Sequence, residues 1–258
     1  MARQEANKAL ELEPSLPEAQ AMLGIVAGIY DYDWKEAERR FRLAMSSDPV
    51  PPQIRQWYGF FYLLPIGRAR EAAQEMERGL EDDPLNILSR QSLAGCYLAA
   101  GMLEEAETQS RKCLELNDAL PYAHLSMAMI HSARGQLAAA IASAEKACSY
   151  ARWPINVGFL AGLLLRNGEP DRAHELLEEL KPEDAYSVPM ALALFHLQRE
   201  DVETAARCVE KAIEQRHALL HSIMFPVTAG ALCSSPYWPK LLKMRNLPSG
   251  ASHAAARI

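Results

Sequence analysis

Residues 83–121 read DPLNILSRQSLAGCYLAAGMLEEAETQSRKCLELNDALP and decide the fold. Apolar residues recur at helical spacing over 87–100, and Gly101 interrupts them. A second helical pattern then runs over 103–116. The stretch therefore predicts two helices joined by a tight turn at the glycine.

This helix–turn–helix unit recurs along the chain. The predicted turn glycines are 34, 34 and 33 residues apart, at Gly67, Gly101, Gly135 and Gly168. An alanine five residues after each of them belongs to a longer ladder: Ala2, Ala37, Ala72, Ala106, Ala140, Ala173 and Ala205. A period near 34 residues with alternating helices is typical of a solenoid whose units pack only on their neighbours. We therefore expect an all-α, right-handed α-solenoid of about six helix pairs.

The units resemble tetratricopeptide repeats (TPR) over roughly residues 1–215. The small residue of this family's first helix is present as Gly24, Gly59, Ala94, Ala128, Ala161 and Ala193. Segments 31–38 (DYDWKEAE) and 234–247 (SSPYWPKLLKMRNL) resemble a narrower group, the C-terminal TPR arrays of bacterial serine/threonine kinases, nucleotide cyclases and winged-helix transcription regulators. That group usually has Asp-Pro-Arg-Phe where this chain has Ser-Pro-Tyr-Trp. The resemblance implies a non-enzymatic scaffold of a signalling protein that binds a protein or peptide partner and needs no cofactor.

The two ends of the array differ from its middle. Residues 1–14 match only the second helix of a unit, so we expect a lone helix there, as in the C-terminal part of a longer protein. After residue 215 the period fails, and residues 216–248 are expected to form a helical cap whose Trp238, Leu241 and Leu242 cover the end of the core. Within the cap, 217–224 and 236–244 are predicted as short helices and 225–230 as irregular. Residues 249–258 are expected to be a flexible tail.

Composition narrows the class of partner. The formal net charge is −6, so the chain as a whole has no basic surface for direct binding of nucleic acid. The apolar runs are too short to span a membrane. The five cysteines are scattered and form no C-x-x-C pair, which favours reduced thiols in the cytoplasm.

The resemblance implies that the first helices of successive units line a concave groove. Ten mostly apolar or amide side chains are expected to form a peptide-binding surface there: Gln53, Gln56, Trp57, Phe60, Leu64, Gln91, Tyr122, Leu125, Met129 and Arg166. Trp57 is the expected main anchor, because buried aromatic residues dominate interface energetics. Chaperone-binding members of the family hold a C-terminal carboxylate with Lys and Asn, and neither residue occupies those positions here. The groove therefore suits an apolar or amphipathic partner segment.

Two alternatives remain open at this point. The superhelix could be tight enough for the groove residues to pack on one another, which would leave no free surface. The chain could also be a self-association module that forms a homo-oligomer through an apolar N-terminal edge.

Catalytic and metal-binding patterns are weak. His124 and His131 fill positions that the family gives to core aromatics, and they read as core residues. His217 and His221 have the spacing of two ligands on one helical face, but no H-E-x-x-H pattern surrounds them. The sequence has no G-x-S-x-G, no G-x-x-x-x-G-K-[ST] and no G-x-G-x-x-G motif. We therefore expect no enzyme active site, no metal site and no nucleotide site.

Overall fold

The computed structural model describes residues 1–222 and 225–247 of the 258-residue chain. All regular secondary structure in these residues is helical, as predicted. The α-helices are α1 (Ala2–Leu12), α2 (Pro17–Ile25), α3 (Trp34–Ala44), α4 (Pro52–Tyr58), α5 (Ala69–Asp82), α6 (Ile87–Ala99), α7 (Leu103–Leu116), α8 (Pro121–Ala133), α9 (Leu137–Tyr150), α10 (Pro154–Arg166), α11 (Pro170–Glu178), α12 (Val188–Gln198), α13 (Val202–Glu214), α14 (Pro226–Cys233) and α15 (Trp238–Met244). Two π-helical segments, η1 (Val26–Tyr30) and η2 (Gly59–Leu63), continue α2 and α4, and η3 (Leu220–Ser222) is a 3₁₀ turn.

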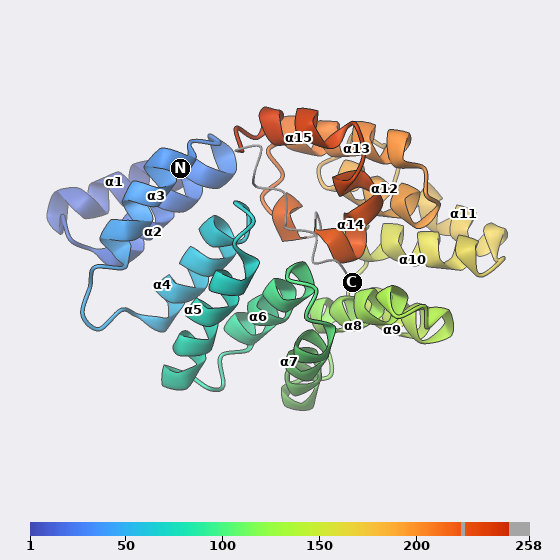
Figure 1. Ribbon diagram of the computed structural model, residues 1–258, viewed down its shortest axis with the longest axis horizontal. Coiled ribbons are helices and arrows are strands. Elements are labelled where there is room, and N and C mark those ends of the chain that lie inside the picture. Colours follow the sequence, from blue (N-terminus) through green and yellow to red (C-terminus); the bar gives the residue numbers. More distant parts are fainter. Residues whose placement is uncertain (223–224, 248–258) are drawn as a thin grey trace.

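The helices form an α-solenoid that curves back on itself. From α2 to α13 they pack as consecutive pairs, each on the next. Figure 1 shows the pairs arranged like a fan around a centre that α14 occupies. The last helix, α15, lies against α13 and extends back toward the first pair. The two ends of the array are therefore brought together.

Sequence features that predicted the repeat have direct structural roles. Gly67, Gly101, Gly135 and Gly168 all have φ between +72° and +86°, a left-handed conformation that glycine adopts without steric cost. The alanine ladder from Ala37 to Ala205 is at most 1% exposed at every step. A larger side chain at these alanines would push paired helices apart, because protein interiors have little free volume.

Helix starts follow from local chemistry. Proline occupies the first turn of α2, α4, α8 and α10, where its missing N–H removes a donor that has no intrahelical partner anyway. At α3, α6 and α13 the side chains of Asp33, Asn86 and Asp201 accept a hydrogen bond from the backbone N–H three residues later. These caps fix the point at which each helix begins.

The π-helical segments explain an irregularity in the repeat length. The sequence predicts one extra residue in the turn around Asp31. In the structure, the N–H of Asp31 donates to the carbonyl of Val26 and that of Leu64 donates to Gly59, five residues back in both cases. A π turn takes up one residue more than an α turn. The π segment η1 therefore holds the extra residue near Asp31 inside the helix, and η2 is the equivalent segment of the next unit. The first helix of the second unit is therefore α-helical only up to Tyr58 and continues as a π segment.

The fifth and sixth pairs pack differently from the others. Gly158 and Gly162 of α10 lie directly against α12, where an added β-carbon would approach the Ala191 carbonyl oxygen to 2.4 Å and the Gln198 side chain to 2.7 Å. Glycine is required at these positions for so close an approach. The partner of α10, α11, has nine residues where α5, α7 and α9 have fourteen. The short α11 leaves space beside α12.

The C-terminal cap differs in detail from its prediction. Trp238, Leu241 and Leu242 are buried, as expected. Residues 226–233 form α14, although 225–230 were predicted as irregular. The non-helical φ of −129° at Ala229 marks a kink inside α14, within the range that was predicted to be irregular. Of the helix expected over 217–224, residues 220–222 form a 3₁₀ turn, and the last two residues and the predicted tail lie outside the described part of the chain.

Candidate protein-interaction site

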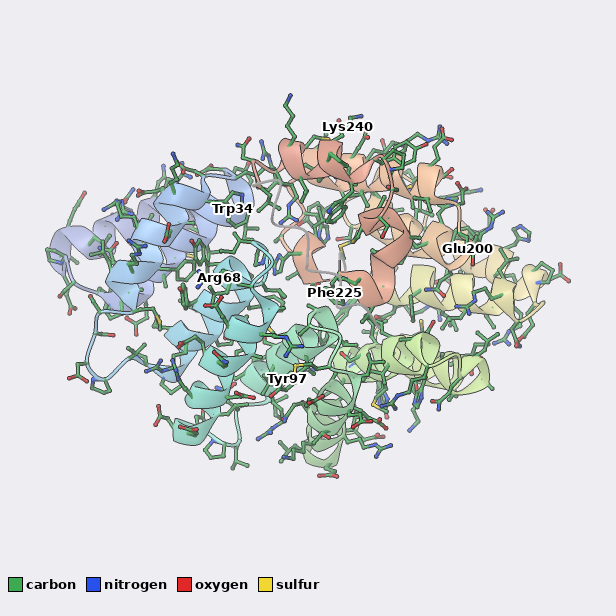
Figure 2. The ribbon with its side chains drawn as sticks, in the orientation of Figure 1. Trp34, Arg68, Tyr97, Glu200, Phe225 and Lys240 are labelled. Atoms are coloured by element: carbon green, nitrogen blue, oxygen red, sulfur yellow. The ribbon has the colours of Figure 1, made fainter. Side chains whose placement is uncertain are left out.

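The centre of the fan is filled by the chain itself. We call residues 217–222 and 225–233 the hub segment. Its Leu220, Phe225, Ala229 and Leu232 are each at most 2% exposed. Figure 2 places Phe225 at the centre of the molecule, and α14 packs on α6, α8 and α12. The hub segment thus occupies the inner face of the first helices, where the sequence predicted a groove.

Two predicted groove residues contact the hub segment directly. The His221 ring packs edge-on against Phe60, with ring centroids 4.9 Å apart, and lies 5.9 Å from Phe61. The hydroxyls of Tyr122 and Ser222 form a hydrogen bond. Burial raises the pKa of Tyr122 to about 12, so this phenol stays neutral at physiological pH. The inner wall therefore holds an apolar segment with a few hydrogen bonds.

The other predicted groove residues fall into two groups. Leu64, Leu125 and Met129 are at most 4% exposed and belong to the hydrophobic core, so they offer no free surface. The remaining five are less buried: Gln53 is exposed, Trp57 and Gln91 are half-buried, Gln56 donates to Ser92 at 3.0 Å, and the exposed Arg166 donates to Gln198 at 2.6 Å. The structure thus brings Phe60 and Tyr122 to the hub, leaves Gln53 and Arg166 at the surface, and places the aliphatic members inside.

Sequence reasoning missed the hub segment as part of the site. The sequence does contain a feature that could have revealed this segment: Phe225, Leu232 and Trp238 are large apolar residues beyond the last repeat. No periodicity connects them to the inner wall, however, so the sequence could not tell whether they cover the end of the core or fill its inner face. The structure shows that α15 does the first and α14 the second.

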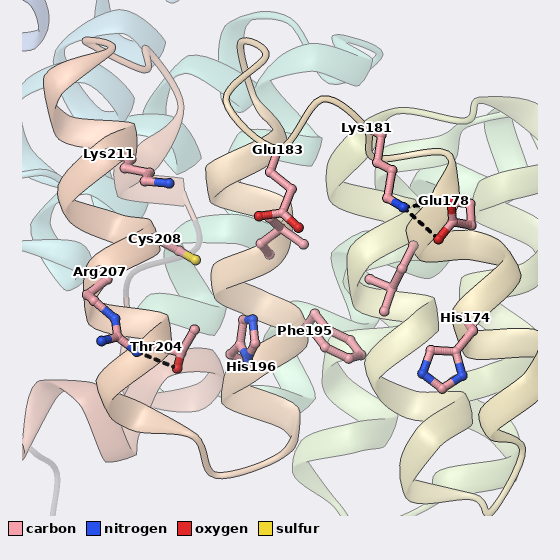
Figure 3. Close-up of a pocket in the computed structure, with 12 residues that line it drawn as sticks. His174, Glu178, Lys181, Glu183, Phe195, His196, Thr204, Arg207, Cys208 and Lys211 are labelled. Atoms are coloured by element: carbon pink, nitrogen blue, oxygen red, sulfur yellow. Dashed lines mark hydrogen bonds and ion pairs between the residues drawn. The ribbon is translucent and has the colours of Figure 1, made fainter.

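A second concavity lies on the outer side of the solenoid. We call it the outer pocket: an open cavity of about 480 Å³ between α11 on one side and α13 on the other, above α12. Figure 3 shows His174, Glu178 and Lys181 on one wall, Thr204, Arg207, Cys208 and Lys211 on the opposite wall, and Phe195 and His196 between them. Leu177 and Leu192 add apolar surface. The pocket exists because α11 is short and α12 packs on α10 instead of on α11.

The groups in the outer pocket are chemically quiet. Lys181 donates to Glu178 at 2.8 Å, and Arg207 bonds with Glu203 and Thr204. Burial lowers the pKa of His196, whose Nδ1 lies 3.3 Å from an Asp201 carboxylate oxygen. Burial also raises the pKa of the Cys208 thiol, which weakens it as a nucleophile. The pocket has no activated nucleophile paired with a base.

The histidines with ligand-like spacing point to different neighbours. His217 stacks on Tyr186 and lies 2.8 Å from the Ser187 hydroxyl, whereas His221 packs on Phe60. His124 is buried, with its Nε2 2.8 Å from the Asp118 carbonyl oxygen. Within residues 1–222 and 225–247 no cluster of three or more metal-ligating side chains occurs.

The N-terminal helix is less apolar on its outer side than the sequence suggested. α1 buries Ala6 and partly buries Ala9 and Leu10 against α2. Its remaining side chains are exposed and mostly polar or charged, apart from Ala2 and Leu12. This edge therefore has no continuous apolar surface.

Comparison with solved structures identifies the architecture. A thermophilic TPR protein from Thermus thermophilus superposes with a TM-score of 0.52 at 22% identity, over 70% of this chain and 98% of that one. The chain has a tetratricopeptide-repeat fold. Two further structures match it: PilW, described as a widely conserved type IV pilus biogenesis factor (TM-score 0.60, 22% identity, 72% of this chain and 87% of that one), and the Cut9–Hcn1 hetero-tetramer of the APC/C (0.63, 14%, 94% and 45%). No protein-family model and no curated protein matches the sequence.

These similarities cover between 70% and 94% of this chain. At identities of 22% or less they concern the fold, and the subfamily resemblance of segments 31–38 and 234–247 finds no counterpart among them. None of the helices in the described residues is long and apolar enough to cross a membrane.

Proposed function

We propose that this TPR protein is a non-catalytic scaffold that binds an apolar or amphipathic segment of a protein partner on its inner wall. One observation carries the proposal: the inner wall already holds such a segment, the chain's own hub, through Phe60, Phe61 and Tyr122. A surface that can bury a kinked apolar helix in cis has the shape and chemistry to bury a similar helix in trans.

The chemistry of the wall defines the partner. Aromatic rings and aliphatic side chains supply the buried area, and the Tyr122 hydroxyl supplies an orienting hydrogen bond. The partner segment would resemble the hub: a short helix with an aromatic residue at its start and small residues along it. The Cut9–Hcn1 complex is a protein complex built on the same fold, which agrees with a protein ligand.

The biological setting follows from the resemblance of segments 31–38 and 234–247. We propose that the scaffold is the regulatory or interaction part of a bacterial signalling protein and acts in the cytoplasm. Its five cysteines agree with a reducing compartment, because all are free and each is buried or half-buried. The partner itself would then be another signalling component.

A pull-down with two matched double variants tests the inner wall. Trp57→Ala/Tyr122→Ala removes two aromatics that the sequence predicts to line the groove, and Trp153→Ala/Tyr30→Ala removes two exposed aromatics elsewhere. Truncating one interface anchor costs at least about 2 kcal/mol, so the loss of even one of the two should weaken binding of the partner to the first variant roughly 30-fold or more. The second should retain it. A wall variant that remains folded by circular dichroism and recovers the same partner as the wild type would eliminate this function.

A self-association module is the alternative function. It would use the N-terminal edge, but the outer side of α1 is mostly polar, so no structural observation favours it. Light scattering over a hundredfold concentration range would reveal it as a concentration-dependent mass.

A further inference from the structure

Two segments that lie at opposite ends of the sequence meet in the structure. The indole Nε1–H of Trp34, at the start of α3, donates a 2.7 Å hydrogen bond to the carbonyl oxygen of Arg245, at the end of α15. The side-chain amide of Asn246 donates to the carbonyl oxygen of Tyr32 at 3.4 Å. These segments are the two that resemble the kinase- and cyclase-linked arrays, at 31–38 and 234–247. The two segments that carry this resemblance are therefore in contact with each other.

Tyr32 is placed to hold this contact. Its φ of +59° lies in the left-handed region, which is uncommon for a residue with a side chain. This backbone conformation accompanies a ring that is only 4% exposed and a hydroxyl that donates to the Ile213 carbonyl oxygen at 3.3 Å. The guanidinium of Arg216 lies 4.3 Å from the ring centroid, a cation–π distance, and that of Arg245 lies 5.9 Å from it.

We call this set of contacts the clasp: Tyr32 and Trp34 on one side, and Ile213, Arg216, Arg245 and Asn246 on the other. Ile213 and Arg216 come just before the hub segment, and Arg245 and Asn246 come after α15, the helix that follows it. The clasp therefore contacts the chain both before and after the hub segment in the sequence. One turn of the first helix pair contacts the chain just before the segment that fills the inner wall and again at the end of α15, the helix that follows that segment.

The first pair is also shaped to supply this turn. Gly28 of η1 makes room for the Trp34 indole, because a β-carbon at position 28 would lie 3.0 Å from the ring. The π turn of η1 ends at Tyr30 and lets the chain reach Tyr32 with one extra residue. Apart from these side chains the first pair contributes little to the cap, so the clasp is a small contact compared with the packing between neighbouring pairs.

We infer that the clasp is a lock on the inner wall: when it opens, the chain before the hub segment and after α15 is freed from the first helix pair, the hub can leave, and the wall becomes available to a partner segment. This inference rests on the proposed function, since it names the regulation of the same surface. The hub segment is then an intramolecular ligand of the wall. The clasp determines the fraction of molecules in which the hub has left the wall. A partner with an apolar helix competes with the hub for Phe60 and Tyr122.

Hydrogen–deuterium exchange of the full chain tests the lock without any partner. Trp34→Phe removes the indole donor and keeps an aromatic ring, and Tyr32→Phe removes only the hydroxyl. In either variant, peptides from residues 217–233 should exchange about tenfold faster or more, while peptides from α6 to α9 keep their wild-type rates. Trp153→Phe, at a half-exposed indole on an outer loop, is the matched control and should change neither region.

Two results would overturn the lock. Unchanged exchange of the hub in both clasp variants would show that the clasp does not hold it. An equal acceleration throughout the chain would make the clasp a general stabilising contact without selective control of the hub.

A binding experiment separates this inference from the proposed function. A fluorescent synthetic peptide with the sequence of residues 217–233 is titrated into the full-length wild type and into Trp34→Phe. Tighter binding to the variant supports both the lock and the wall as a binding surface. Faster hub exchange without any peptide binding would sustain the lock and remove the proposed function.

Discussion

Gly158 of α10 lies so close to Ala191 of α12 that a β-carbon at position 158 would come within 2.4 Å of the Ala191 carbonyl oxygen. Backbone, not a flexible side chain, blocks this position, so Gly158→Ala must move the two helices apart. Overpacking of this kind costs about 1–3 kcal/mol or more. We expect the free energy of unfolding, measured by urea denaturation, to fall by at least that amount.

Gly95→Ala is the matched control for this prediction. A β-carbon there would meet only the Tyr122 hydroxyl at 3.5 Å, an ordinary contact. Replacing a glycine inside a helix by alanine gains up to about 1 kcal/mol, so Gly95→Ala should be neutral or stabilising. Equal destabilisation by both variants would argue against the close packing of α10 and α12.

The hydrogen bond between Tyr122 and Ser222 gives a second prediction. Tyr122→Phe keeps the ring and removes the hydroxyl, and a lost buried hydrogen bond costs about 1 kcal/mol. The variant should unfold at correspondingly lower urea concentration. Tyr30→Phe changes a tyrosine that is 62% exposed and should leave the midpoint where it is. Indistinguishable midpoints for Tyr122→Phe and wild type would mean that the bond contributes nothing.

His217 makes stability depend on pH. Burial lowers the pKa of this ring from its ordinary value near 6.5. Its Nδ1 accepts a hydrogen bond from the N–H of Leu219, so its Nε2–H donates to the Ser187 hydroxyl and the ring is neutral. The unfolded chain then binds a proton at a higher pH than the folded chain. The stabilising contribution is complete above about pH 6.5 and is lost as the pH falls toward the folded pKa.

We therefore expect the melting temperature to fall between pH 7.5 and 5.5, and to fall less in His217→Gln. The difference between the two proteins should be largest near pH 7.5, where the neutral ring makes both hydrogen bonds. His174→Gln changes an exposed histidine of the outer pocket and serves as the control. A pH profile of His217→Gln that parallels the wild type would show that His217 does not couple protonation to folding.

The five free thiols should differ in their rates of alkylation. Cys208 lines the outer pocket and is partly exposed, whereas Cys96 is fully buried and burial raises its pKa. Burial raises the pKa of Cys113 and Cys148 to about 11 and that of Cys233 to about 12. Iodoacetamide at pH 7.5 should modify Cys208 first. The rate at Cys96 should be about one tenth of the rate at Cys208 or lower, as measured by peptide mass spectrometry. Comparable rates at Cys96 and Cys208 would reveal frequent opening of the core.

The repeat was readable from the sequence because its signals are local. A turn glycine such as Gly101 is needed for its positive φ, and an alanine such as Ala106 is needed for helix contact, so each leaves a residue at a fixed spacing. The π segments were not predicted, because an inserted residue such as the one before Asp31 can equally lengthen a turn. Sequence alone does not decide between the two.

The site was less predictable for a different reason. The repeat positions assign Phe60 and Tyr122 to the inner wall, and in the structure both lie against the hub segment. What covers them was not predicted, because the contact between Phe60 and His221 joins residues with no periodic relation. Even so, the two segments that suggested a subfamily turned out to be neighbours, so the resemblance contained three-dimensional information that the residue pattern did not disclose.

The contact between Trp34 and Arg245 also changes how the array should come apart. An open row of repeats has two free ends, and it loses structure from them one unit at a time. Here the clasp joins the two end units, so neither unit can unfold separately until the clasp contacts are broken. The unfolding transition should then be sharper than that of a linear array of the same length. Removal of the clasp contacts should restore the gradual unfolding from the ends that a linear array shows.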